Sequence, residues 1–135
     1  MIADPAISVM EMLTVGLMAA LGTAIGALLR FEISRRLIQR LGDVFPWATL
    51  GINLAGCLLA GLLFAFFGSS AGLAKVFFSI GVLGGFTTVS SFSLETVLMI
   101  QRGHWNSALV YAAASLVGGV AAAGLGIVLA RIAGL

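Results

Sequence analysis

Residues 84 to 95 read GGFTTVSSFSLE, and they combine two adjacent glycines with a run of hydroxyl-bearing side chains. They overlap a run without charged residues, 76 to 94, whose centre lies near Gly84 and Gly85. If that run crosses a bilayer, the glycine pair falls close to the midplane. Irregular backbone is tolerated at that depth only where it is buried in protein or lines a wet cavity. An unwound turn there would expose carbonyls to a cation and a helix N-terminus to an anion.

We therefore interpret the glycine pair as the centre of a functional break in a membrane helix. Ser90 or Ser91 is expected to cap the second half-helix, and Glu95 is expected to lie in its first turn, where negative charge is favourable. The alternative is a continuous helix in which Gly84 and Gly85 serve packing and the hydroxyls bond back to carbonyls four residues earlier.

Four other polar residues lie in or beside apolar runs and could contact an ion. The amide of Asn53 is costly in hydrocarbon unless it is bonded, and it can either donate to an anion or join two helices. Tyr111 and Ser115 are four residues apart and hence on one helix face, where they line a path or form a satisfied buried pair. Arg30 either attracts an anion or anchors the end of a helix.

The inventory of side chains argues against an enzyme. The single histidine, His104, is separated from the hydroxyl run, and the sequence has no G-x-S-x-G nucleophile motif. Cysteine, histidine and carboxylate residues show no spacing typical of a zinc site. Proton-coupled transport usually needs a carboxylate deep in a span, and Glu95 is the only candidate in the sequence.

Composition identifies the class of protein that must position these residues. Of the 135 residues, 61% are hydrophobic and only 9% are charged, whereas soluble domains carry about 25% charged residues. The net charge of +2 comes from a few arginines rather than a basic patch, so nucleic acid is not an expected partner. The sequence predicts an all-α integral membrane protein with membrane lipid around it, as one domain over residues 1–135.

Uncharged runs mark the expected membrane spans. A spanning helix needs about 20 apolar residues, and the runs support four helices, with a turn signal, GSSAG, at residues 68–72 between the second and third. Their expected extents are 10–38, 45–67, 73–101 and 105–131. The first is expected to continue past Arg30 as an amphipathic tail.

Small residues predict how the helices meet. Gly22-x-x-x-Gly26 in the first helix allows close approach of two backbones. Further glycines of this kind lie in the second and fourth helices: Gly51, Gly56, Gly61, Gly118, Gly119, Gly124 and Gly126.

Basic residues are distributed with only a modest bias between the two sides of the membrane. The loops that join the first to the second and the third to the fourth helix carry five arginines, against Lys75 and Arg131 on the other side. This favours termini outside, but the excess is small, and insertion in both orientations stays open.

Four motifs, in order and spacing, give the chain a family resemblance. They are GALLRF at 26–31, PWATLGINLAG at 46–56, GVLGGFTTVSSFSLET at 81–96 and YAAASLVG at 111–118. Along nearly its whole length the chain resembles the Fluc (CrcB) fluoride channels, and the third motif is the most specific.

The resemblance implies an antiparallel, dual-topology dimer of four-helix subunits. The broken third helices would cross at the dimer centre and hold a structural sodium ion (Na+) through backbone carbonyls. By position, those ligands would be Gly84 and Thr87 of each subunit. The implied function is passive export of fluoride through a multi-pass protein of the inner (plasma) membrane, which limits fluoride toxicity.

The resemblance also assigns an ion pathway. Asn53 matches the pore asparagine of the family, and Val89 and Phe92 align with its two pore phenylalanines. An aromatic ring has a positive edge that can face an anion. The remaining pathway residues that the resemblance implies are the hydroxyls of Thr88, Ser90 and Ser91, a polar track at Tyr111 and Ser115, and Arg30 near the vestibule.

Two positions depart from the family pattern. Val89 replaces the first phenylalanine, and Gly119 replaces a serine that often continues the polar track. A homodimer would lack that ring in both pathways, whereas a heterodimer with a sister subunit could keep one pathway active. This chain would then be a half-active or non-conducting subunit. A small proton-coupled multidrug exporter is the remaining alternative, although residues 12–29 contain no carboxylate.

Overall fold

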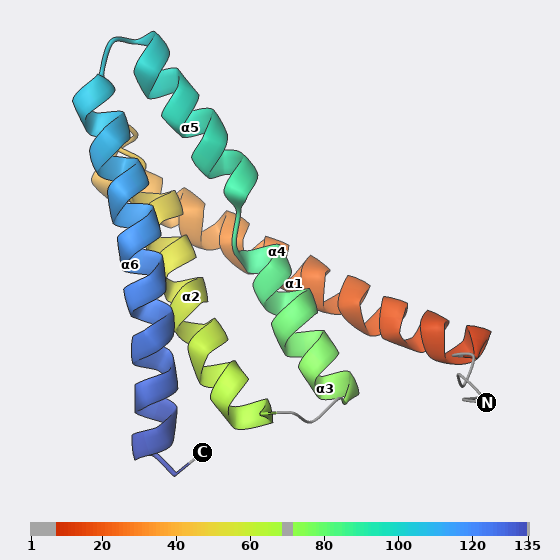
Figure 1. Cartoon of the computed structure of the whole chain (residues 1–135). Helices are drawn as coiled ribbons and strands as arrows, with labels where there is room; N and C mark the ends of the chain where they lie inside the picture. Colours follow the sequence, from red (N-terminus) through yellow and green to blue (C-terminus); the bar gives the residue numbers. More distant parts are fainter. Residues whose placement is uncertain (1–7, 69–71, 135) are drawn as a thin grey trace, which may run out of the picture.

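The computed structural model describes residues 8–68 and 72–134, and every regular element within them is helical (Figure 1). Four helices are long and apolar enough to cross a membrane, which confirms the expected fold class of four membrane helices. The elements are α1 Val9–Leu41, α2 Trp47–Phe67, α3 Leu73–Lys75, the π-helix η1 Val76–Val82, α4 Leu83–Phe86, α5 Val89–Gln101 and α6 Trp105–Ile132. We call α3, η1, α4 and α5 together the third span.

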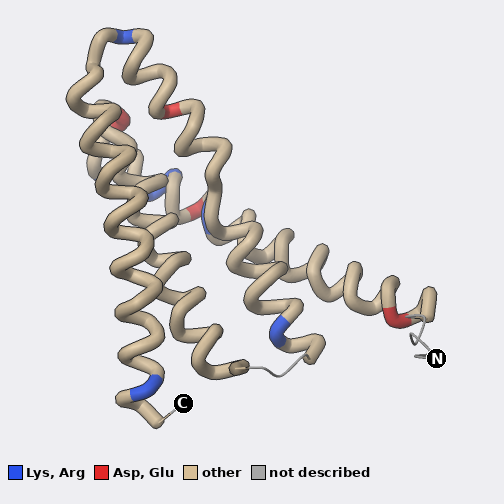
Figure 2. The backbone as a smooth tube through the Cα atoms, in the orientation of Figure 1, with Lys and Arg blue, Asp and Glu red and all other residues tan. Residues whose placement is uncertain are grey.

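The observed ends of the helices lie within three residues of the expected extents. Gly68, with φ of 51°, ends α2, and Gly72 precedes α3. The middle of the expected turn, residues 69–71, lies outside the described residues. Charged residues are absent from α2 and occur in α6 only at Arg131, so long stretches of both helices are free of charge (Figure 2).

Helix α1 begins at a capping box and is longer than a bilayer is thick. The Ser8 hydroxyl accepts from the Glu11 N–H, and the Glu11 carboxylate accepts from the Ser8 N–H. The 33 residues of α1 span about 50 Å at about 1.5 Å per residue, against about 30 Å of hydrocarbon. Its C-terminal part therefore extends past the apolar run, as expected from the sequence.

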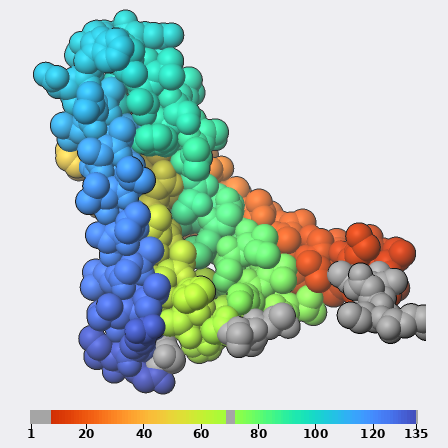
Figure 3. Space-filling view, viewed as in Figure 1, coloured from red at the N-terminus to blue at the C-terminus, as the bar shows by residue number. Residues whose placement is uncertain are grey.

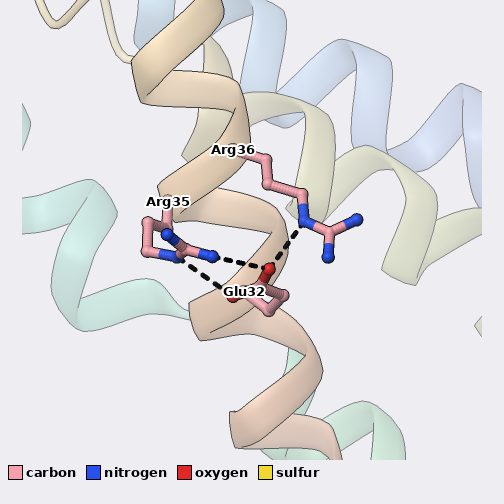
Figure 4. Close-up of polar contacts among 3 residues, drawn as sticks. All are labelled: Glu32, Arg35 and Arg36. Carbon is pink, nitrogen blue, oxygen red and sulfur yellow. Dashed lines mark hydrogen bonds and ion pairs between the residues drawn. The ribbon is translucent and has the colours of Figure 1, made fainter.

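This C-terminal part of α1 carries a charged triad (Figure 4). Glu32 forms ion pairs with Arg35 at 2.8 Å and with Arg36 at 2.6 Å, and the three side chains are between 37% and 68% exposed. Exposed pairs of this kind contribute little to stability. The triad instead marks this part of α1 as the charged and exposed end of the helix.

The helices pack mainly as two pairs. Helix α2 packs along α6, and α1 packs along η1 and α4 of the third span (Figure 1). Gly61 and Gly126 bring α2 and α6 together, because a methyl group on either would overlap the facing backbone. Gly118 lies against Leu54, as expected for a packing glycine.

The second pair is held by glycines on both helices. Gly22 of α1 faces Gly81 of the third span, whereas Gly26 faces the backbone of Val82 and Phe86. On each helix the glycines have the four-residue spacing of one face. A methyl group at Gly26 would overlap the Val82 carbonyl oxygen. The packing predicted for Gly22 and Gly26 is therefore confirmed. Gly51 and Gly124, by contrast, have open space beside them within this chain.

The third span is interrupted, but not where the sequence predicted. Gly84 and Gly85 are helical, and the interruption lies at Thr87 and Thr88, which are extended with φ/ψ of −81°/158° and −149°/118°. Gly85 faces the backbone of Thr23, so its glycine serves packing. The prediction of a break was right, and its centre at the glycine pair was wrong.

Gly26→Ala should destabilise the protein by about 1 to 3 kcal/mol, because the added methyl group forces α1 away from the third span. Gly16→Ala is the matched control, since nothing lies within 4 Å of its added methyl group. It should be neutral or stabilising through the helix propensity of alanine. Reversible unfolding in detergent, followed by circular dichroism, measures both. Equal effects of the two variants would contradict the glycine contact.

Candidate ion-binding site

The second half of the third span is capped by Thr88. Its Oγ1 accepts from the Ser91 N–H at 3.1 Å, and its hydroxyl lies 3.1 Å from Oγ of both Ser90 and Ser91. The prediction that Ser90 or Ser91 caps α5 was wrong. Thr88 is the extended residue just before the helix, which is the conformation of an N-cap, whereas Ser90 and Ser91 already have helical backbone.

Two residues of α2, Asn53 and Gly56, contact the interruption. Asn53 accepts from the Thr88 N–H through Oδ1 at 2.9 Å and donates to the Thr88 carbonyl through Nδ2 at 3.0 Å. Gly56, three residues on and hence on the same face, lies against the Thr87 methyl group. The interhelical bond is thus the observed role of Asn53, and its second Nδ2 hydrogen has no partner among the described residues.

The interruption releases backbone carbonyls from the helical ladder. In a continuous helix Gly84 O would accept from the Thr88 N–H and Thr87 O from the Ser91 N–H, but both N–H groups are engaged elsewhere. Arg30 Nη1 lies 3.4 Å from Thr87 O. Within residues 8–68 and 72–134, no group of three His, Cys, Asp or Glu could hold a metal. The Gly84 and Thr87 carbonyls are thus both without their helical donors.

A groove of about 560 Å³ lies beside the interruption, between α2, α6 and the third span, on the face where Figure 3 shows the helices diverging. None of its lining residues carries a charge. It brings together many of the residues predicted to contact ions: Asn53, Gly84, Thr87, Thr88, Val89, Phe92 and Ser115.

Ser115 contributes an unusual group to this groove. Its Oγ is buried and has no hydrogen-bond partner among the described residues. Val89 opens α5 at the same groove, with 77% of its surface exposed. Gly119 lies just outside, next to Cys57, whose sulfur would be 3.4 Å from an added methyl group. The lining of the groove thus includes a residue with a buried hydroxyl, Ser115, and an exposed apolar residue, Val89.

Tyr111 and Glu95 form a second polar cluster that does not include Ser115. The Glu95 carboxyl group accepts from Tyr111 Oη at 2.7 Å and from Thr49 Oγ1 at 2.6 Å. Tyr111 is fully buried, and its ring packs 5.1 Å from that of Phe92. Glu95 is the seventh residue of α5, so its predicted place in the first turn was wrong. Tyr111 and Ser115 are also not a mutually bonded pair.

Thr49 is the residue of this cluster that sequence reasoning did not single out. A signal was present, because Thr49, Asn53 and Gly56 recur at the spacing of one helix face. That face contacts Glu95, Thr88 and Thr87 in turn. The remaining predicted residues, Arg30, Ser90 and Ser91, do not line the groove and contact the interruption instead.

Comparison with known sequences decides the family. Residues 17–127 match the sequence model of the family described as CrcB-like protein, Camphor Resistance (CrcB). The chain belongs to the CrcB-like protein family.

Several CrcB-like relatives carry the name Fluoride-specific ion channel FluC. The protein of Novosphingobium aromaticivorans is 46% identical over 116 residues, covering 83% of this chain and 92% of the relative. A protein of Thermus thermophilus is 45% identical, covering 82% and 90%, and that of Magnetococcus marinus is 43% identical, covering 84% and 94%. The match to these ion channels therefore spans nearly the whole four-helix unit.

Tyr111→Phe should destabilise the protein by about 1 to 3 kcal/mol, because it keeps the buried ring but removes a donor from the partly buried Glu95 carboxyl group. Ser93→Ala is the matched control, since the exposed Ser93 hydroxyl only bonds back to Val89 O within α5. Its effect should stay within about 0.5 kcal/mol. Unfolding in detergent compares the two, and a neutral Tyr111→Phe would contradict a stabilising bond to Glu95.

Proposed function

We propose that this chain is a subunit of a fluoride channel that conducts fluoride passively across the inner (plasma) membrane, as a multi-pass protein. The observation that carries the proposal is the groove at the interruption, which offers hydrogen-bond donors and no carboxylate among its lining residues. A pore must replace the water around fluoride with donors that release the ion quickly. The free Nδ2 hydrogen of Asn53 and the Ser115 hydroxyl suit that task.

Two further features favour an anion over a cation in the groove. The ring of Phe92 lines it and can present its positive edge. The guanidinium of Arg30, next to the Thr87 carbonyl, adds positive potential near the interruption. The hydroxyls of Ser90 and Ser91 contact that of Thr88 next to the groove, and the ring of Tyr111 packs against Phe92.

The size of the groove favours a dimer. A volume of about 560 Å³ is far larger than the about 30 Å³ that one water occupies in the liquid. A single chain therefore leaves an ion hydrated, and a second apolar surface must close the groove. We propose an antiparallel homodimer, in line with the modest bias of basic residues. Gly84 is exposed, and a methyl group added to it would meet nothing within 4 Å, so this position suits close approach of the second chain.

The same interruption suits a structural sodium ion. Gly84 and Thr87 each offer a carbonyl without a helical donor, and carbonyl oxygens are ligands that sodium accepts in broken membrane helices. The resemblance assigns these two carbonyls of each chain, so two chains would complete a four-oxygen site. When bound, the ion would neutralise carbonyl dipoles that meet at the dimer centre.

Purified protein in liposomes loaded with fluoride should release fluoride at a rate that rises with protein content, measured with a fluoride electrode while a potassium ionophore balances charge. Liposomes loaded with chloride should retain it, because a larger, more weakly hydrated anion does not match the donors. Fluoride retention by protein that is folded by circular dichroism would contradict conduction by this chain alone.

A second candidate, a non-conducting or half-active subunit of a heterodimer, is favoured by one residue. Val89 lies at the groove without the aromatic ring that the resemblance predicts. In this case conduction would require coexpression with a sister chain.

Val89→Phe should raise fluoride release by the lone chain several-fold, because it adds an aromatic edge to the groove. Leu94→Phe is the matched control, since Leu94 is also exposed on α5, at 61%, but does not line the groove. It should leave the rate unchanged. Equal rates for both variants and the unmodified chain would contradict a pore position for Val89.

A further inference from the structure

Asn53 meets the third span in a way that a pore donor does not require. The oxygen and the nitrogen of its side-chain amide both bond the backbone of one residue, Thr88, at 2.9 and 3.0 Å. The orientation of the amide is fixed, because a backbone N–H can only donate and a carbonyl can only accept. Thr88 itself is buried, with 6% exposure.

This two-way bond is selective for an extended residue. In extended backbone the N–H and C=O of one residue point to the same side, so one partner can pair with both, as in an antiparallel ladder. In a helix the two groups point in opposite directions along the axis. Thr88 has φ/ψ of −149°/118°, so the amide of Asn53 recognises the interruption itself.

Without Asn53, the Thr88 N–H would need another acceptor, because hydrocarbon offers none. Gly84 O is the acceptor that helical geometry provides, and using it would require Thr88 to become helical. We propose that Asn53 is a positioning residue that keeps the third span interrupted by replacing the helical partner of Thr88. It thereby holds the Gly84 carbonyl free and also orients its own second Nδ2 hydrogen toward the groove.

The positioning role of Asn53 rests on the same groove as the proposed fluoride conduction. Its test measures no ion flux, so the positioning role and the conduction can fail independently. The sequence offers isolated spectroscopic reporters. Thr87–Thr88 is the only Thr–Thr pair, and Gly–Gly pairs occur only at 84–85 and 118–119. In protein labelled with carbonyl ¹³C and amide ¹⁵N in glycine or threonine, magic-angle-spinning NMR therefore gives one or two directly bonded carbonyl–nitrogen signals.

Asn53→Leu should move the Gly84 carbonyl signal downfield, toward that of Gly118 in the continuous helix α6, because the carbonyl regains a helical donor. The Thr87–Thr88 signal should move toward helical values as well. Asn53→Asp keeps an acceptor for the Thr88 N–H, so it should leave the Gly84 signal in place. If the substitutions acted only by disturbing the packing, the Gly84 signal would move in both variants.

Asn106→Leu is the matched control, since Asn106 is the other asparagine and is exposed in the first turn of α6. It should change none of these signals. An unchanged Gly84 signal in folded Asn53→Leu would overturn the proposal.

If Asn53→Leu fails to fold, the proposal can be tested on the unmodified protein. With side-chain ¹⁵N asparagine and carbonyl ¹³C threonine, a through-space contact between Asn53 Nδ2 and a threonine carbonyl is expected. Its absence would overturn the proposal equally.

Discussion

A bilayer supplies no water to backbone groups, so a helix that opens inside it depends on the protein for partners. The interruption at Thr87 and Thr88 receives such partners from three directions. Asn53 of α2 takes both backbone groups of Thr88, the Thr88 hydroxyl caps α5, and Arg30 of α1 reaches the Thr87 carbonyl. The site is therefore a property of three helices, although its sequence signature lies in one.

The glycines pack the part of the third span that precedes the opening. Gly81 lies against Gly22 and Gly85 lies against the backbone of Thr23, and both have helical backbone, in η1 and α4. The extended residues Thr87 and Thr88 follow shortly after this contact. Gly84 points away from α1 and keeps its open side for another surface. The adjacent glycines thus have different roles: Gly85 packs against α1, and Gly84 leaves an open surface.

Sequence reasoning predicted the four helices, because long uncharged runs admit few other structures in a membrane protein. It predicted that the third helix is interrupted, but it assigned the interruption to glycine flexibility. The position depends instead on contacts from Thr23 and Asn53, which lie far away in sequence. The bonds of Glu95 were missed for the same reason, since they depend on which helices become neighbours. The cap at Thr88 is a local contact with Ser91, and it was missed because the break was assigned to the glycine pair.

The polar face of α2 places three contacts at successive levels of the third span: Thr49 to Glu95, Asn53 to Thr88 and Gly56 to Thr87. Removing one residue between Pro46 and Thr49 would shift the phase of that face by about 100° relative to the helix start. All three contacts would then be misaligned together. The second helix of this protein should therefore tolerate changes of residue type over evolution far better than changes of length.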